Sequence, residues 1–229
     1  MPLRPYLQKL EKQQRLTKII APISKTYEIA GVLKQLEPTP VLFETIKESD
    51  WRVVGNLFCT KAAFADYFGI DVPGIIPMLA QAIDRRRPAE IIDLAPCQEV
   101  VHTDPDLDWL PILKHCAGDG GNYISAGVVI AKHPRYGQNM DFHRCMQFSK
   151  TEMAMRVVGS RHFDTFLREL GQVDVAVCVG NPPNVLAAAA TSVALGIDEL
   201  EIVWPSGMRQ VLRDVATDES MIVVEPPGP

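Results

Sequence analysis

The sequence lacks an excess of positive charge. Its 229 residues include 23 Lys and Arg against 28 Asp and Glu, a formal net charge of −5. The basic residues are scattered apart from Arg85–Arg87, whereas the phosphate backbone of a nucleic acid is bound by a broad positive surface. We therefore expect no nucleic-acid partner, and we interpret the three arginines as the solvated last turn of a helix.

The sequence also lacks cysteines at the spacings that disulfides or zinc sites require. Its cysteines are odd in number, far apart and never arranged as C-x-x-C. Disulfide frameworks and cysteine-ligated zinc sites both need paired cysteines. Neither is expected here, and the pattern favours a reducing cytoplasm as the setting. The five positions are Cys59, Cys97, Cys116, Cys145 and Cys178.

No apolar run is long enough to cross a bilayer. The longest, Val185–Ile197, is interrupted by Thr191 and Ser192, and a spanning helix needs roughly 20 apolar residues. Met1–Leu16 is charged and amphipathic, unlike a secretory signal peptide. With 47% hydrophobic residues the chain can form a substantial core, so we expect a globular protein with no membrane span.

The first hundred residues predict a small α/β region. Apolar residues recur at helical spacing in two places, around a short extended piece, and Pro38 ends the second helix. Thr60 is expected to cap a helix that stops at Gly69, and Pro73 to open the next one. The two helices are expected around Leu3–Leu10 and Ile29–Leu36, and two strands at Val41–Ile46 and Arg52–Cys59.

A segment rich in Pro and Asp, Asp93–Pro111, predicts a linker to a second region. Strands followed by a helix and a further strand favour a mixed α+β sheet or a split barrel. The expected strands are Ile124–Lys132, Asn139–Lys150, Met153–Val158 and a buried Val173–Val179, and the helix is His162–Leu170, closed by Gly171. We thus divide the chain into residues 1–100, 101–202 and a tail, 203–229, with a short helix Arg209–Val215 and a strand Met221–Val224.

The segment Asn139–Arg144 carries four kinds of polar group at the head of a strand. An arginine such as Arg144 can bind a substrate carboxylate through two parallel hydrogen bonds. The alternative is that polar residues merely face outward on a half-exposed strand. Because successive side chains of a strand point to alternate faces, Asn139 and Arg144 lie on opposite faces unless a bulge intervenes or Asn139 lies at the strand's end.

Three other segments leave two interpretations open. Arg161-His162 precedes a helix, where an anion is favoured, but most isolated pairs of this kind are ordinary surface residues. Gly118–Gly121 precedes a strand, unlike a phosphate-binding loop, and forms either a tight turn or a loop lining a pocket. Ala187–Ala190 allows close approach by a flat ligand or belongs to a tightly packed helix. No group of possible ligands has the sequence spacing that is typical of a metal site.

Taken in order, these segments resemble the UbiD family, from about Leu3 to Ile202. The resemblance lies in the ordered spacing of several motifs rather than in any one of them. The matching segments are Arg52–Phe58, Gly118–Gly121 with Tyr123–Val129, Asn139–Arg144, Ala154–Arg156, Arg161-His162, Ala187–Ala190 and Gly196–Glu201. On this resemblance residues 101–202 form a split-barrel-like domain that binds prenylated FMN.

The resemblance also implies the cofactor site. Members of the family hold prenylated FMN through its phosphate, with a manganese-type divalent ion and a potassium ion. Asn139, His162 and Glu199 fall on the metal-ligand positions, and their oxygen and nitrogen donors suit such an ion. The other positions near the cofactor are Asp141, Phe142, His143, Arg144, Arg161, Ala189, Ala190, Thr191 and Ser192.

The implied activity is a carboxy-lyase (decarboxylase) that acts non-oxidatively on an aromatic or α,β-unsaturated carboxylic acid. Arg144 falls on the arginine of the family's Glu-Arg-Glu catalytic network. Both glutamates of that network lie beyond Glu199, before a large C-terminal oligomerisation domain, and the tail from residue 203 matches neither. A catalytically silent flavin- or nucleotide-binding module with an assembly or regulatory role is therefore the alternative, and a flavin oxidoreductase a third.

The resemblance further implies the partners of the chain. They are a small-molecule carboxylic acid as substrate, a flavin prenyltransferase that supplies the cofactor, and either further copies of the chain or a second subunit carrying the missing half.

Overall fold

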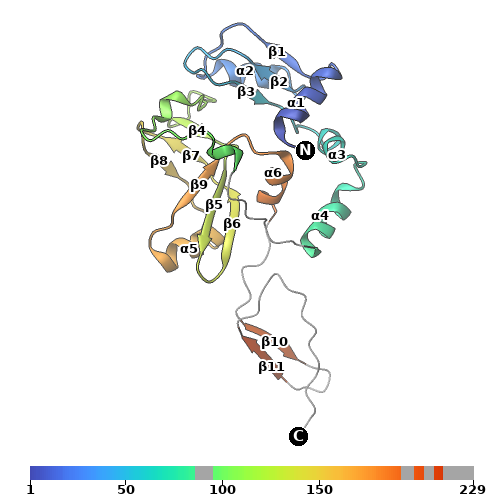
Figure 1. Ribbon diagram of the computed structural model, residues 1–229, viewed down its shortest axis with the longest axis vertical. Helices are drawn as coiled ribbons and strands as arrows, with labels where there is room; N and C mark the ends of the chain where they lie inside the picture. The colour runs from blue at the N-terminus through green and yellow to red at the C-terminus, as the bar shows by residue number, and fades with distance from the viewer. Residues whose placement is uncertain (86–94, 192–198, 204–208, 214–229) are drawn as a thin grey trace.

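The computed structural model describes residues 1–85, 95–191, 199–203 and 209–213. The N-terminal region is a three-stranded sheet with helices around it (Figure 1). Its central strand β2 is fully buried and runs parallel to β1 and antiparallel to β3. The elements are α1 (Leu3–Lys12), β1 (Thr17–Ile19), α2 (Glu28–Gln35), β2 (Val41–Phe43), β3 (Val53–Gly55), α3 (Lys61–Phe68) and α4 (Ile75–Asp84).

The helix ends of this region follow local signals in the sequence. Thr60 Oγ1 accepts a hydrogen bond from the backbone N–H of Ala63 at 3.1 Å, and Gly69 ends α3 in the left-handed conformation with φ 70°. Both predictions are confirmed. Helix α4 ends at Asp84 and Arg85 follows it, whereas Arg86 and Arg87 lie outside the described residues.

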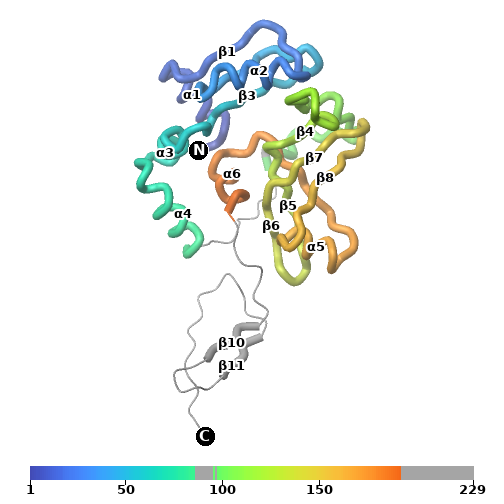
Figure 2. The backbone as a smooth tube through the Cα atoms, turned by 180° about the vertical axis from the view of Figure 1, so that it is seen from behind, coloured from blue at the N-terminus to red at the C-terminus, as the bar shows by residue number. Residues whose placement is uncertain are grey.

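The second region contains two more three-stranded sheets, with strand orders β4-β7-β8 and β6-β5-β9. The predicted helix His162–Leu170 is confirmed with the same bounds. Figure 2 shows this region beneath the N-terminal sheet, with α6 beside β6. The elements are η1 (Pro96–Gln98), η2 (Leu107–Trp109), β4 (Asn122–Ile124), β5 (Val128–His133), β6 (Gly137–Phe142), β7 (Cys145–Gln147), β8 (Met153–Met155), α5 (His162–Leu170), β9 (Val175–Cys178) and α6 (Pro183–Ala189).

Two predicted strands are each divided between the two sheets. The chain leaves one sheet for the other at residues 125–127, between β4 and β5, and again at 143–144, between β6 and β7. Gly127 permits the first crossing, because a Cβ there would lie 2.7 Å from Ile124 Cγ2. Strands β5 and β6 form an antiparallel hairpin, with His133 paired to Gly137 at its end.

The core of the second region lies between β5 and α5. Val129 and Ala131 of β5 pack with Phe163 and Phe166 of α5, and all four are buried. The prediction that the segment around β9 is buried is wrong: Val175 is 43% exposed and Val177 38%. Strand β9 pairs only with β5 among the described residues, and α5 covers the middle of the sheet rather than this edge.

The last described elements are β10 (Glu199–Val203) and β11 (Arg209–Arg213), which form an antiparallel pair. The prediction of a helix at Arg209–Val215 is therefore wrong over 209–213, because pairing with residues about ten positions earlier overrides a weak local preference. The predicted strand Met221–Val224 lies outside the described residues. The mixed α+β prediction is confirmed, and the sheets of the described residues are open rather than closed into a barrel.

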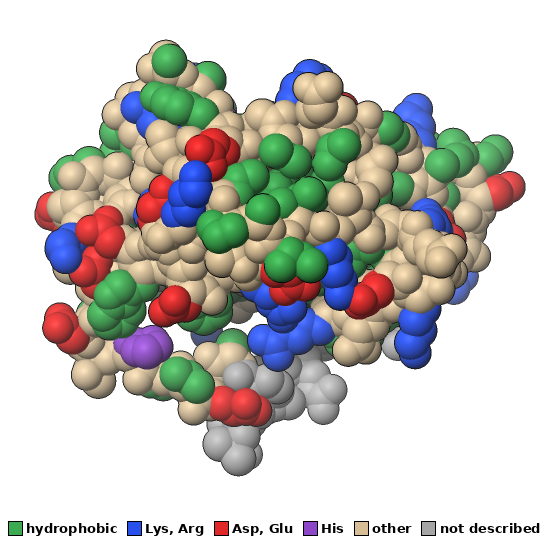
Figure 3. Space-filling view, turned by 90° about the horizontal axis from the view of Figure 1, so that it is seen from above, with side chains coloured by type: hydrophobic (Ala, Val, Ile, Leu, Met, Phe, Trp, Pro, Cys, Tyr) green, Lys and Arg blue, Asp and Glu red, His purple; other side chains and the backbone are tan. Residues whose placement is uncertain are grey.

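None of the helices among the described residues has the length and apolar character needed to cross a membrane. On the face of the molecule seen in Figure 3, acidic and basic side chains are interspersed rather than gathered into one positive area.

Candidate cofactor site

A pocket of about 370 Å³ lies where β6, the start of α5 and the end of α6 come together. It combines an amide, a carboxylate, two imidazoles and a guanidinium with small and apolar side chains. The residues that line it are Asn139, Met140, Asp141, Phe142, His143, Val158, Arg161, His162, Ala189, Ala190 and Thr191.

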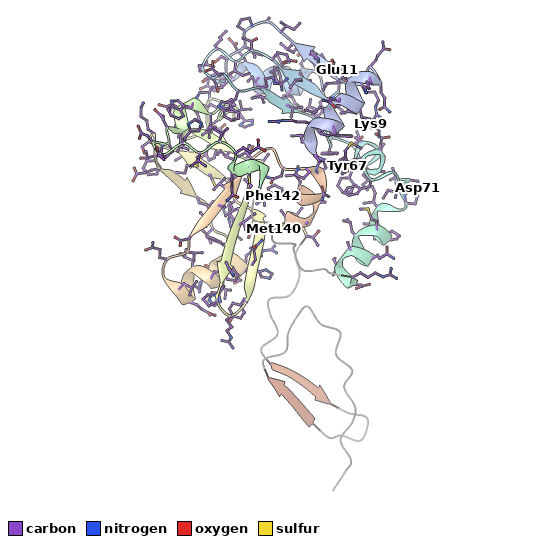
Figure 4. All side chains as sticks on the ribbon, in the orientation of Figure 1. Lys9, Glu11, Tyr67, Asp71, Met140 and Phe142 are labelled. Atoms are coloured by element: carbon purple, nitrogen blue, oxygen red, sulfur yellow. The ribbon has the colours of Figure 1, made fainter. Side chains whose placement is uncertain are left out.

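The pocket follows from the alternation of side chains along β6. Asn139 and Asp141 pair with Ala131 and Val129 of β5, so they share the sheet face that α5 covers. Met140 and Phe142 project to the other face, and Figure 4 shows both on β6 on the side of α6. Strand β6 is an edge strand of the described sheet, and the pocket wraps around that edge.

Asn139 and His162 meet although 23 positions separate them. The distance between Asn139 Oδ1 and His162 Nδ1 is 3.1 Å. Adjacent ligands of an octahedral ion at about 2.1 Å are about 3.0 Å apart, so this spacing suits two ligands of one divalent ion. The Asn139 Nδ2 atom is buried and has no hydrogen-bond partner among the described residues. The pair therefore fits a metal or phosphate site.

His143 and Asp141 form a charged pair in the wall of the pocket. The Nε2 atom of His143 lies 2.9 Å from Asp141 Oδ1, and its Nδ1 atom lies 3.0 Å from the carbonyl oxygen of Arg156. The close Asp141 carboxylate raises the pKa of His143 above 6.5; burial opposes this rise, and the Arg156 carbonyl adds to it. The ring is buried against Phe163, with the ring centres 4.9 Å apart.

Arg161 is the N-cap residue of α5, and it is exposed at the pocket's rim. The first turn of the helix is fixed by Asp164, whose Oδ2 accepts a hydrogen bond from the Ser160 backbone N–H at 2.8 Å and lies 3.0 Å from Arg168 Nε. These two contacts lower the pKa of Asp164, the backbone bond more than the arginine. The free N–H groups at the start of a helix favour an anion such as phosphate.

The structure does not bring every predicted site residue to the pocket. Arg144 follows the end of β6, is exposed, and does not line the pocket. Ser192 lies outside the described residues, as does the side chain of Glu199 at the start of β10. Figure 1 shows the β10–β11 hairpin apart from the sheet that contains β6. No cluster of three His, Cys, Asp or Glu side chains suited to a metal occurs in the described part of the chain.

Sequence reasoning missed two residues of the pocket, Met140 and Val158. Both side chains are apolar, so the sequence gives no reason to assign them to a binding site. They line the pocket because of how β6 and α5 are placed. The interpretation of Gly118–Gly121 as a turn is supported: Asp119 Oδ2 accepts hydrogen bonds from the His115 and Cys116 N–H groups, and a Cβ on Gly121 would lie 3.1 Å from Gln147 O. This loop lines neither described pocket.

A second hollow of about 880 Å³ lies between the turn at residues 47–51 and the segment 102–110. Its walls include Trp51 and Trp109, together with charged groups of both signs. None of the predicted site residues lies there.

Two family models match this chain. The N-terminal domain of 3-octaprenyl-4-hydroxybenzoate carboxy-lyase matches residues 7–83, and the Rift-related domain of the same carboxy-lyase matches residues 90–208. The second match alone covers more than half of the chain. The fold is thus that of a carboxy-lyase of this type, and the chain belongs to the UbiD family.

Curated relatives support this assignment. The chain is 32% identical over 185 residues to an anhydromevalonate phosphate decarboxylase of Methanothermobacter thermautotrophicus, which covers 79% of this chain and 43% of the relative. It is 30% identical over 202 residues to the enzyme of that name in Methanosarcina mazei, covering 86% and 46%. The chain therefore spans less than half the length of these relatives.

Solved structures show the same fold. An evolved dimeric form of the UbiD-class enzyme HmfF from Pelotomaculum thermopropionicum, in complex with prFMN, superposes with a TM-score of 0.80 at 30% identity, over 86% of this chain and 48% of that one. The vanillic acid decarboxylase of Sedimentibacter hydroxybenzoicus superposes with a TM-score of 0.77 at 24% identity, over 84% and 45%.

Proposed function

We propose that this chain is the cofactor-binding portion of a UbiD-type carboxy-lyase that acts without net oxidation on an aromatic or α,β-unsaturated carboxylic acid through prenylated FMN. The observation that carries the proposal is the pocket around β6. Nine of the twelve residues predicted to bind the cofactor line it, and they come from three separate elements. The names of the relatives support decarboxylation, and the HmfF complex supports the cofactor.

In this proposal, residues that line the pocket bind the phosphate group of the cofactor. Asn139 and His162 supply oxygen and nitrogen donors to a Mn²⁺-type ion, with Glu199 as the proposed third ligand. Arg161 and the start of α5 provide positive charge for the phosphate, and a K⁺ ion would add to it. Ala189, Ala190 and Thr191 leave room for a flat ring system.

The chemistry is divided between cofactor and protein. When bound, prenylated FMN supplies the electron sink that makes loss of carbon dioxide feasible. Arg144 is proposed to hold the substrate carboxylate through a two-point hydrogen bond, a geometry that a lysine does not match. Arg144 is exposed and follows His143 of the pocket lining in the sequence, and we propose that a substrate entering from solvent meets it there.

The function also implies partners. We propose that further copies of the chain or a second subunit complete the substrate side of the site. A flavin prenyltransferase is the proposed source of the cofactor.

A catalytically silent flavin- or nucleotide-binding module with an assembly or regulatory role is the second candidate. The observation in its favour is that Arg144, the proposed catalytic residue, does not line the pocket that holds the other predicted residues. Such a module would bind the cofactor without turning over an acid.

Co-expression with a flavin prenyltransferase tests the two candidates. Absorbance and mass analysis of the purified chain would identify the bound cofactor, and carbon dioxide release would be measured with anhydromevalonate phosphate, vanillic acid and cinnamic acid. Bound prenylated FMN with carbon dioxide release is the expected result. Bound cofactor without release supports the silent module, and absence of any bound flavin contradicts both.

A further inference from the structure

The charge balance of the pocket depends on a pair that the proposed function leaves without a role. Asp141 lines the pocket, and its side chain is 25% exposed. An unpaired carboxylate at this position would repel a phosphate. The other charged or titratable groups in the lining are Arg161, His162 and His143.

The surroundings of His143 favour a protonated ring. Both ring nitrogens face atoms that accept hydrogen bonds: the carbonyl oxygen of Arg156 at 3.0 Å from Nδ1 and the carboxylate oxygen of Asp141 at 2.9 Å from Nε2. A neutral imidazole carries only one N–H and would leave one of these acceptors facing a lone pair. With Nδ1 donating to the Arg156 carbonyl, protonation of Nε2 places a positive charge 2.9 Å from the negative Asp141 carboxylate in place of a lone pair.

We propose that His143 is a positioning residue that neutralises Asp141 and so allows the pocket to accept a phosphate-bearing flavin. This inference rests on the proposed function. With the pair neutral, the charge of Arg161 and the start of α5 act on the phosphate without opposition. Without His143, a carboxylate lining the same pocket offsets Arg161.

Flavin affinity in a set of variants tests the inference, with FMN and riboflavin as probes because they differ only in the phosphate. His143→Gln removes the positive charge and should weaken FMN binding about tenfold or more, while riboflavin affinity changes less than about threefold. The double variant that also carries Asp141→Asn should regain FMN affinity to within about threefold of the wild type, because it lacks the negative charge of the Asp141 carboxylate.

A matched control separates charge from folding. His133 is also buried and lies near a carboxylate, with Nε2 3.5 Å from Glu169 Oε2, but it does not line the pocket. His133→Gln should leave the ratio of FMN to riboflavin affinity unchanged. Asp141→Asn alone provides a milder variant if His143→Gln does not fold, and it should bind FMN at least as tightly as the wild type.

The outcomes distinguish the inference from the proposed function. Equal loss of both flavins in His143→Gln, no rescue in the double variant, or loss of FMN in Asp141→Asn would overturn the inference alone. A wild-type chain that binds neither flavin would overturn the proposed function and the inference with it.

Discussion

Arg144 and His143 are neighbours in the sequence with different surroundings. His143 is buried and forms part of the pocket wall, whereas Arg144 is exposed and lies outside the lining. The strand break at residues 143–144 separates them. A residue that contacts the substrate and one that shapes the cofactor pocket should respond differently to substitution.

Arg144→Ala should abolish carbon dioxide release by the cofactor-loaded protein while flavin remains bound, because the guanidinium is assigned to the substrate carboxylate. The measurement is carbon dioxide release together with bound flavin per chain. Arg168→Ala, on the exposed face of α5, is the matched control and should retain release. Loss of flavin from Arg144→Ala would contradict the assignment.

The raised pKa of His143 predicts how stability depends on pH. Its folded pKa lies above the 6.5 of a free imidazole, so the stabilisation is fully present below about pH 6.5 and is lost as the pH rises through the folded pKa. The difference in unfolding free energy between the wild type and His143→Gln should therefore shrink as the pH is raised. Urea unfolding at a series of pH values checks this, and a difference that grows with pH would refute it.

At the scale of elements, strand β6 determines the site because it presents side chains from both of its faces around one free edge. Asn139 and Asp141 face α5, while Met140 and Phe142 lie toward α6. The strand ends at Phe142, so its alternation does not extend to Arg144, and Arg144 does not line the pocket with Asn139.

Element boundaries could be predicted where the signal is local. Thr60, Gly69 and Gly171 end or begin helices through contacts within a few residues, and those predictions are confirmed. The division of strands between two sheets and the exposure of β9 could not be predicted, because they depend on distant partners. Nor could spacing reveal the meeting of Asn139 and His162, which only the family resemblance anticipated.

Thr60→Ala should destabilise the N-terminal region by about 1 kcal/mol, because the Ala63 N–H loses its partner. Thr60→Ser keeps an oxygen at the same position and should restore most of that loss. Urea denaturation measures both variants, and equal stability of Thr60→Ala and the wild type would show that the cap contributes nothing. Flavin binding should be unaffected, since α3 does not line the pocket.

At the scale of the whole molecule, the two regions are connected near the site. Tyr67 of α3 packs with Tyr6 and Leu10 of α1, and its hydroxyl lies 3.4 Å from Asn184 Oδ1 of α6. Helix α6 in turn carries Ala189 into the pocket. Helix α3 therefore contacts the helix that forms one wall of the site, although no described residue of the N-terminal region lines the pocket.

The proposed metal site is tested most directly by calorimetry of Mn²⁺ binding with FMN present. The proteins compared are the wild type, Asn139→Ala, His162→Ala and Glu199→Ala. We predict that each variant binds Mn²⁺ at least about tenfold more weakly and loses FMN affinity along with it, because the proposed site has one cation held by these side chains and by the phosphate. Arg52→Ala, which is remote from the pocket, should match the wild type. Unchanged Mn²⁺ affinity in both Asn139→Ala and His162→Ala would show that these two side chains do not bind a common metal ion.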